Sequence, residues 1–284
     1  MTNTVPVQDA TGEEWDCLIV LDACRYDSFE RLYDGYFSGD LQKRRSPGSA
    51  TPEWAAKTFT ADHDITYLSA NPFVNSLGVP LDELRWGASC EYEWAAADHI
   101  DTVVDLWRDA WDDDLGAVTP GSVTEHARRW REETDDPLVV HYLQPHAPYL
   151  RRGTGRKLRR IRGGVAAPPE DDPPDGSAVG AVREWVERRL GRSQVAMMLG
   201  MLVELDPASV FDIGGRGFAE TIRSYYEENL RLALAAASDL ASDLDGRVVV
   251  TADHGEAFGE HGVWEHHVET HIPPLVDVPW LVLD

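Results

Sequence analysis

Metal-ligand side chains cluster near the carboxyl end of the chain. Residues 251–267 read TADHGEAFGEHGVWEHH, and five of the ten histidines lie between His254 and His271. Asp253 and His254 are adjacent and directly follow an apolar run. A carboxylate beside an imidazole offers the oxygen and nitrogen ligands that divalent ions take in proteins. The pair therefore indicates a divalent metal site.

Two other apolar runs end near side chains of the same kind. Asp22 closes the run DCLIVLD at 16–22, and His146 follows the run LVVHYL at 138–143. Ligands of open α/β sheets bind in the crevice at the carboxyl ends of the strands. We therefore expect Asp22, His146 and the Asp253-His254 pair to meet at one edge of a sheet.

The elements that position these side chains alternate between short apolar runs and helical segments. Continuous apolar runs are typical of strands covered on both faces, and their alternation with helices predicts an α/β fold with a largely parallel central sheet and helices on both faces. The predicted strands are Asp16–Asp22, Ile65–Ser69, Leu138–Leu143, Arg247–Ala252 and Val278–Leu283. The predicted helices are Ala23–Tyr33, Ser122–Glu133, Ala181–Leu205 and Glu220–Leu244, the last of which ends at a Gly stop signal.

One region departs from this alternation. Residues 165–177 contain four prolines, which indicates a loop. Just before it, seven of the twelve residues in 151–162 are basic, in an otherwise acidic chain. We therefore expect one domain over 1–284 with an excursion at about 151–219.

The overall charge is strongly negative. With 50 acidic residues against 26 Lys or Arg, the 284-residue chain carries a formal net charge of −24. Its 43% hydrophobic content is enough for a sizeable core, so we expect a globular protein. A broad negative field repels phosphate backbones and anionic headgroups, which disfavours nucleic-acid and membrane-surface binding. This acidity, with only three lysines, indicates a protein from a halophilic organism; the alternative is an acidic enzyme from a mesophile.

The sequence also indicates a cytoplasmic protein without a membrane span. Residues 1–15 lack a basic start followed by an apolar stretch, so no secretory signal is expected. The most apolar helical run, Val195–Leu205, is shorter than the roughly 20 residues that cross a bilayer. The cysteines at positions 17, 24 and 90 show no CxxC spacing and are interpreted as buried thiols.

The chain resembles a known family in several ordered motifs. The segment DHGEAFGEHGVW at 253–264 is similar to the C-terminal signature of the alkaline phosphatase and sulfatase superfamily, in its sulfatase-like branch. LIVLDACR at 18–25 resembles the first strand with its metal-binding Asp, and QPHAPY at 144–149 resembles the mid-chain His-x-Pro segment. The likeness is weakest at about 86–121 and 151–219. It implies an alkaline-phosphatase-like fold in a single sulfatase-like domain.

The resemblance places the nucleophile in SPGSATPEW at 46–54, at the start of a helix. A helix N-terminus suits an anionic ester, and Pro52 agrees with such a start. Thr51 is the first candidate and Ser49 the second; alternatively, Thr51 caps the helix. Because no Cys lies in this loop and no Ser-Arg pair follows it, the formylglycine route of sulfatases is disfavoured. A Thr nucleophile resembles the members that transfer phosphoryl groups.

The resemblance also implies roles for the remaining residues. One or two divalent ions, Mn, Zn, Mg or Ca, are expected, and His ligands and His proton donors look alike in sequence. Arg25 neutralises phosphate charge or pairs with Asp27, and Ser49 is also a substrate-binding candidate. The implied metal ligands are Asp22, Thr51, Asp253 and His254. The resemblance also implies roles for His146, His261 and His266, which bind a second ion, contact phosphate oxygens or protonate the leaving group.

These residues predict a metal-dependent hydrolase or transferase that acts on phosphate esters through a phosphothreonine intermediate. The alternatives are a sulfate-ester hydrolase with an atypical nucleophile and an inactive metal-binding protein. The expected substrate is an anionic small-molecule or glycan ester. The basic run 151–162 either supplies positive charge at the mouth of the site or forms a mobile arm or a salt-bridged face.

Overall fold

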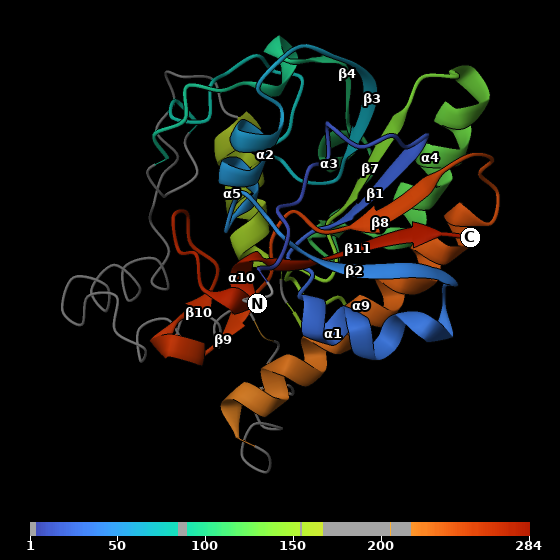
Figure 1. Ribbon diagram of the computed structural model, residues 1–284. Helices are drawn as coiled ribbons and strands as arrows, with labels where there is room; N and C mark the ends of the chain where they lie inside the picture. Colours follow the sequence, from blue (N-terminus) through green and yellow to red (C-terminus); the bar gives the residue numbers. More distant parts are fainter. Residues whose placement is uncertain (1–3, 85–89, 154, 167–204, 206–216) are drawn as a thin grey trace.

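Strand β1 (Cys17–Leu21) lies in the middle of a seven-stranded sheet (Figure 1). The computed structural model describes residues 4–84, 90–153, 155–166, 205 and 217–284. The strand order is β2-β11-β8-β1-β7-β3-β4. The other strands of the sheet are β2 (Gly39–Arg45), β3 (His63–Ser69), β4 (Ile100–Asp105), β7 (Leu138–Tyr142), β8 (Val248–Thr251) and β11 (Asp277–Leu283).

Five adjacent strands of the sheet, from β8 to β4, run parallel to one another, as predicted. β1 pairs in parallel with β7 and β8, and β3 pairs in parallel with β7 and β4. β11 lies antiparallel between β8 and β2, which makes the sheet largely rather than wholly parallel. The edge strands β2 and β4 were absent from the predicted strands, because their polar, half-exposed sequences lack a continuous apolar run.

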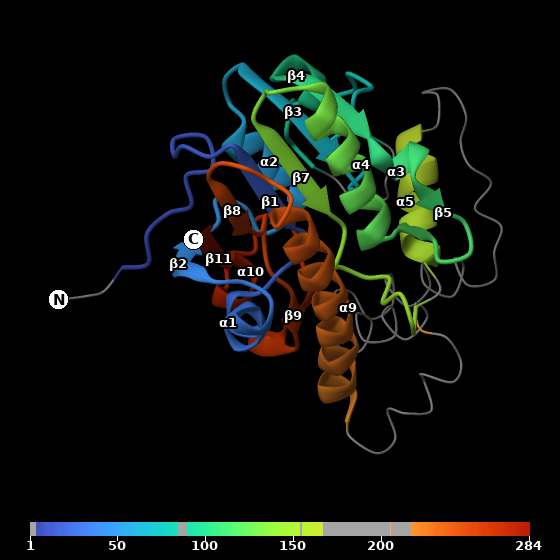
Figure 2. The same cartoon turned by 90° about the vertical axis from the view of Figure 1, so that its right-hand side faces the viewer.

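Helices cover both faces of the sheet, which confirms the predicted architecture (Figure 2). The helices are α1 (Tyr26–Leu32), α2 (Thr51–Thr58), α3 (Leu106–Asp109), α4 (Pro120–Glu133), α5 (Arg156–Ala166), α9 (Phe218–Ala241) and α10 (Pro273–Val276). Two short ladders, β5 (Trp111–Asp112) with β6 (Ala117–Val118) and β9 (Ala257–Phe258) with β10 (Trp264–Glu265), lie outside the main sheet. The predicted helix 181–205, apart from Leu205, and most of the expected excursion lie outside the described residues.

The side chains of β1 alternate between two hydrophobic layers. Ile19 and Leu21 belong to the core shared with α1, α4 and α9. Leu18 and Val20 belong to the core on the other face, together with Trp54 of α2. Both faces of this strand are buried, and all five of its residues are apolar. The same burial forces the polar residues that follow the strand to find partners inside the protein.

Helix α9 lies on the α4 side of the sheet and leads into β8. Its buried side chains recur at three- and four-residue spacing, which keeps one stripe of the helix against the core. Gly246, with φ of 91°, provides the left-handed turn between the helix and the strand. Among the helices of the described part of the chain, none combines the length and apolar character needed to span a membrane.

Candidate active site

Four of the predicted site residues converge at the carboxyl edge of the sheet. Asp22 follows β1, Asp253 and His254 follow β8, and Thr51 is the first residue of α2. The Thr51 hydroxyl donates to Asp253 Oδ2 at 2.7 Å and lies 3.4 Å from His254 Nε2. His254 Nε2 lies 3.5 Å from Asp22 Oδ1 and 3.4 Å from Asp253 Oδ2. All four side chains are buried.

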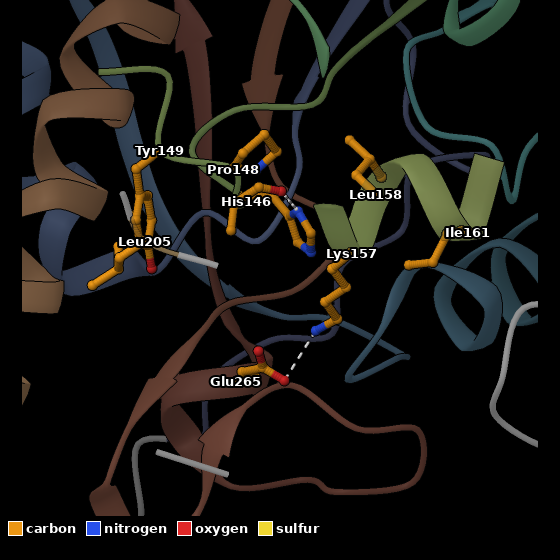
Figure 3. A pocket seen from close by; sticks show the side chains of 9 residues that line it. His146, Pro148, Tyr149, Lys157, Leu158, Ile161, Leu205 and Glu265 are labelled. Carbon is orange, nitrogen blue, oxygen red and sulfur yellow. Dashed lines mark hydrogen bonds and ion pairs between the residues drawn. The ribbon is translucent and has the colours of Figure 1, made fainter. Parts of the chain in front are cut away.

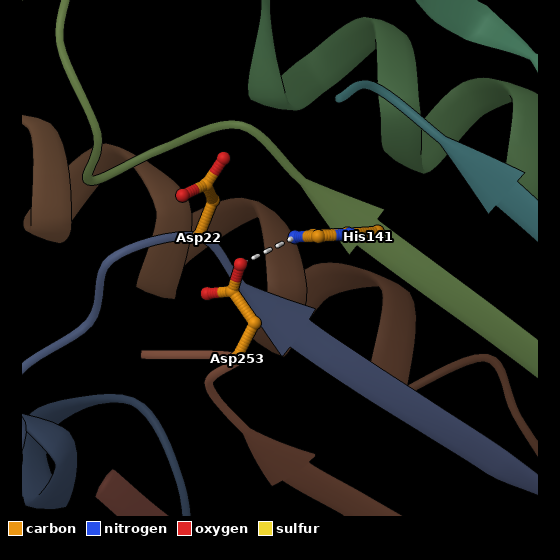
Figure 4. Close-up of side chains that lie close together, drawn as sticks. All are labelled: Asp22, His141 and Asp253. Atoms are coloured by element: carbon orange, nitrogen blue, oxygen red, sulfur yellow. Dashed lines mark ion pairs between the residues drawn. The ribbon is translucent and has the colours of Figure 1, made fainter. Parts of the chain in front are cut away.

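A fifth side chain, His141 of β7, faces the same point (Figure 4). Its Nε2 lies 3.7 Å from Asp253 Oδ2. Ligand atoms of Asp22, His141 and Asp253 all lie within 4.8 Å of one another. Asp22 Oδ1 and His141 Nε2 are buried and have no hydrogen-bond partner among the described residues. Buried polar atoms normally have partners, so these two oriented atoms and the carboxylate beside them fit a divalent cation.

The two buried carboxylates titrate in opposite directions. Burial and the nearby charge of Asp253 raise the pKa of Asp22 well above its ordinary value. Burial also favours a higher pKa for Asp253, but His254, His141 and the hydrogen bond from Thr51 outweigh it and lower this pKa. A cation at this point would let both carboxylates ionise, because an opposite charge favours the ionised form.

A tight turn after β1 holds Asp253 in place. Ala23 adopts φ of 61°, in the left-handed region that is costly for a residue with a Cβ. Its N–H donates to Asp253 Oδ1 at 3.1 Å. The Tyr226 hydroxyl of α9 donates to the Ala23 carbonyl and accepts from the Arg25 N–H, both at 2.8 Å. Helix α9 therefore fixes the backbone that orients this carboxylate.

Two supporting residues were missed by the sequence analysis. Asn71 Nδ2 donates to Asp22 Oδ2 at 2.6 Å and to Thr51 Oγ1 at 3.0 Å. Asn71 follows a predicted strand at the same sheet edge, so the rule that singled out Asp22 could also have found it. His141 lies inside a predicted strand, and only the pleat of β7 shows that its side chain faces Asp253. The Tyr67 hydroxyl lies 2.8 Å from His141 Nδ1.

A row of imidazoles leads away from the buried cluster. The ring centroids of His254 and His266 are 4.4 Å apart, and those of His266 and His146 are 5.0 Å apart. Burial, together with the neighbouring His266, lowers the pKa of His146 to about 3. Burial raises the pKa of Glu256 to about 7, and its Oε1 lies 3.3 Å from His266 Nδ1. The structure thus brings His146 and His266 beside His254, whereas His261 is exposed in the turn after β9.

Comparisons with known proteins relate the sequence and the fold to proteins of known activity. No family model matches the chain. Human iduronate 2-sulfatase is 29% identical over 153 residues, which cover 50% of this chain and 26% of that protein. The mouse enzyme of the same name is 25% identical over 146 residues, with the same two shares. The match therefore spans about a quarter of the length of these relatives.

A solved structure supports the architecture over nearly the whole chain. The soluble domain of lipooligosaccharide phosphoethanolamine transferase A from Neisseria meningitidis superposes with a TM-score of 0.51, over 94% of this chain and 75% of that domain, at 13% identity. The sequence likeness to a sulfatase and the shared fold together support the resemblance of the chain to the alkaline phosphatase/sulfatase superfamily. The fold places the predicted motif residues Asp22, Asp253 and His254 together, although they come from two strand ends far apart in the sequence.

The loop before α2 distinguishes the two nucleophile candidates. Ala50, not Thr51, occupies the N-cap position of α2, so the capping role considered for Thr51 is not what the structure has. The Ser49 hydroxyl donates to Glu53 Oε2 at 2.7 Å and accepts from the Thr270 N–H at 2.9 Å. Thr51 therefore faces the metal-ligand cluster, whereas the hydroxyl of Ser49 is engaged in hydrogen bonds that anchor the loop to Glu53 and Thr270.

Arg25 is engaged by carboxylates of the chain itself. Its Nε and Nη2 each donate to Asp27 at 2.8 Å, and its Nη1 donates to Glu260 Oε1 at 2.7 Å and to the Glu256 carbonyl at 2.9 Å. The pairing with Asp27 that the sequence left open is thus present. A role for Arg25 in binding substrate stays a prediction.

The described part of the basic run lies in the loop after β7 and in α5. Arg159 donates to the Asp113 and Asp114 carbonyls, and Arg162 donates to the Trp107 carbonyl at 3.0 Å. Lys157 pairs with Glu265 at 2.9 Å, close to His146. Parts of the run therefore bind neighbouring backbone, and one member reaches the edge of the site.

Proposed function

We propose that the chain is a metal-dependent enzyme that transfers the phosphoryl group of a phosphate ester to Thr51, and from there to water or to a second alcohol. The position of the Thr51 hydroxyl carries this proposal. Its oxygen lies 2.7 Å from Asp253 and 3.4 Å from His254, and its side chain is almost fully buried. A threonine with a purely structural role would not require two potential metal ligands within contact distance of its hydroxyl, so this arrangement favours a chemical role for Thr51.

The proposed step is a displacement at phosphorus. The bond between Thr51 Oγ1 and phosphorus forms while the bond from phosphorus to the leaving alcohol oxygen breaks. The hydroxyl gives up its proton and the departing alcohol gains one, so that protons balance over the step. In-line attack places the leaving alcohol on the side of phosphorus opposite Thr51. Water or a second alcohol then attacks the phosphothreonine and restores the hydroxyl.

The residues present fit a divalent ion, which would lower the pKa of the hydroxyl and offset phosphate charge when bound. Asp22, Asp253, His254 and Thr51 would hold it, and His141 offers a further nitrogen. Asn71 orients Asp22 and Thr51 through its two hydrogen bonds. His266 and His146 are the next imidazoles in the row beside His254, and they are the candidates for contacting the phosphate or leaving oxygens.

The test compares three esters of one chromophore on the protein loaded with Mn²⁺, Zn²⁺, Mg²⁺ or Ca²⁺ in concentrated salt. 4-Nitrophenyl phosphate, bis(4-nitrophenyl) phosphate and 4-nitrophenyl sulfate share the same leaving group. We expect metal-dependent turnover of a phosphate ester, which Thr51→Ala lowers about 10³-fold or more. Acid quenching and mass spectrometry should find phosphate on Thr51 in the wild type and in Ser49→Ala.

The other outcomes each contradict the proposal in a different way. Turnover of the sulfate alone would assign sulfate-ester hydrolysis, the activity named for the iduronate 2-sulfatase relatives. Phosphate found on Ser49 would move the nucleophile. Tight metal binding without turnover of any ester would indicate a metal-binding protein without catalytic activity.

A further inference from the structure

One buried carboxylate beside the metal-ligand cluster has no part in the proposed phosphoryl transfer. Glu256 lies two residues after His254, and its side chain is 4% exposed. Its oxygens Oε1 and Oε2 lie 3.3 and 3.4 Å from the same atom, Nδ1 of His266. Among the described residues, no other donor lies within hydrogen-bonding distance of this carboxylate. Because a buried carboxylate is costly unless it is hydrogen-bonded, the contact with His266 is its main compensation.

The backbone on both sides of this contact is held in place. Arg25 Nη1 donates to the Glu256 carbonyl at 2.9 Å. On the other side, Glu265 adopts φ of 59°, in the left-handed region that is costly for a residue with a Cβ. Its carboxylate forms a 2.9 Å ion pair with Lys157, which Figure 3 shows. A strained backbone persists only where the surrounding structure holds it, so these contacts fix the position of His266, the next residue.

His266 is the middle ring of the row of imidazoles, and its bonding differs from that of its two neighbours. Nδ1 of His254 and Nδ1 of His146 each bond the carbonyl of the residue that follows in the chain. A carbonyl oxygen only accepts, so these two rings, when neutral, carry their proton on Nδ1 and leave Nε2 without one. Nδ1 of His266 instead faces the side chain of Glu256, ten residues away in the sequence. The tautomer of this ring therefore depends on a side chain that mutation can remove.

We propose that Glu256 is a positioning residue that acts through His266. The carboxylate accepts from Nδ1–H, which fixes the ring between His254 and His146 and leaves Nε2 as the nitrogen that meets the ester. The inference rests on the proposed function, in which His266 is a candidate for contacting the phosphate or leaving oxygens. The physical reason is general, because the bond made by one nitrogen of a histidine decides the proton and the orientation of the other.

The tautomer of His266 tests the contact without relying on turnover. Long-range ¹H–¹⁵N correlation spectra of the full-length protein with ¹⁵N-labelled histidine show which ring nitrogen carries the proton. At pH 8, above the ordinary histidine pKa near 6.5, the rings are neutral. We expect Nδ1–H at His266 in the wild type, both with and without Zn²⁺. His266→Gln identifies the signal by removing it.

Two variants locate the origin of this tautomer. Glu256→Ala should lower the Nδ1–H fraction of His266 from about nine-tenths to below about half, because the hydrogen bond that selects this form is lost. Glu265→Gln is the matched control, since it removes a neighbouring carboxylate and its partly exposed pair with Lys157 but leaves Glu256 in place. It should keep the wild-type tautomer. Unchanged signals of the histidines outside the site show that each variant is folded.

Kinetics show whether the contact serves catalysis. We expect Glu256→Ala and His266→Ala each to lower kcat/KM for 4-nitrophenyl phosphate about tenfold or more. The double variant should be no slower than His266→Ala, because two residues that act as a unit have non-additive effects. A purely structural loss at Glu256 would instead add to the loss at His266.

The outcomes separate this proposal from the proposed function. Nε2–H at His266 in the wild type, or Nδ1–H that persists in Glu256→Ala, would overturn the positioning role whether or not the protein turns over an ester. Losses that add in the double variant would also overturn it, because Glu256 would then not act through His266. Absence of turnover in the wild type, together with the expected tautomer, would contradict the proposed function and leave the contact itself confirmed.

Discussion

The Thr51 hydroxyl donates a 2.7 Å hydrogen bond to Asp253, although the two residues are 202 positions apart in the sequence. Thr51 opens a helix on one face of the sheet, and Asp253 follows β8, which neighbours the central strand. The proposed nucleophile and a proposed metal ligand therefore hold each other in place. We expect metal binding and turnover to depend on the same few side chains.

Asp22→Asn should have opposite effects on stability with and without metal. In the metal-free protein the raised pKa of Asp22 means that stability falls as pH rises above the ordinary value near 3.9, because the folded state retains a proton that the unfolded state loses. Asn keeps an oxygen for Asn71 and removes the repulsion with Asp253. In EDTA, its urea midpoint should therefore exceed that of the wild type, and more so at pH 8 than at pH 5.

With metal the order should reverse. The wild type should gain stability from Mn²⁺ or Zn²⁺, because a ligand that binds only the folded state stabilises it. Asp22→Asn should lose most of this gain and bind less than one equivalent of metal after dialysis. Asp34→Asn, at an exposed carboxylate, is the matched control and should behave as the wild type. A metal-dependent gain that persists in Asp22→Asn would remove this residue from the ligand set.

Glu53→Gln should destabilise the protein in a pH-dependent way. The buried Glu53 carboxylate accepts hydrogen bonds from Ser49, Lys57 and Glu269, and these contacts outweigh burial and lower its pKa to about 2. Its contribution is complete above the ordinary Glu pKa near 4.3 and is lost as pH falls toward 2. We expect a loss of about 2–4 kcal/mol at pH 7 that shrinks between pH 4.5 and pH 2.5. Urea unfolding at several pH values measures this difference, and a pH-independent loss would contradict it.

Tyr67→Phe should weaken metal binding more than it weakens the fold. Tyr67 is the only described partner of His141 Nδ1 at hydrogen-bond distance, and it fixes the ring whose Nε2 faces Asp253. Loss of such an outer partner costs about 10- to 100-fold in metal affinity, against about 1 kcal/mol for one hydrogen bond in stability. Competition with a chromophoric chelator measures the affinity. Unchanged affinity in both Tyr67→Phe and His141→Gln would exclude His141 from the ligands.

Arg25→Gln should lower stability while leaving the KM for an aryl phosphate nearly unchanged. Four hydrogen bonds from this guanidinium go to groups of the protein itself, and its two carboxylate partners offset its charge. Because Asp27 and Glu260 are partly exposed and stay solvated, losing the charged hydrogen bonds of Arg25 should cost about 1.5–3 kcal/mol. Thermal unfolding and steady-state kinetics measure the two effects. A KM raised tenfold or more at full stability would instead support the predicted role of Arg25 in substrate binding.

The sequence predicted the central strands and helix α9 because each of them shows a pattern among residues close together in the sequence. Strands such as β1 and β8 are buried on both faces and consist almost entirely of apolar residues, so their ends could be identified directly from the sequence. The polar edge strands β2 and β4 have no such run and were found only in the structure. Helix α9 was predicted from its stripe of buried residues, whose period is a local property of the helix.

The sequence by itself determined that Asp22, Asp253 and His254 lie at strand ends on one edge of the sheet, since parallel strands bring their carboxyl ends together. Only the tertiary structure decided which neighbours complete the cluster. The pleat of β7 aims His141 at Asp253, and the packing of α2 places Thr51, rather than Ser49, at the cluster. These choices depend on the packing of elements far apart in the chain, which no local pattern of residues encodes.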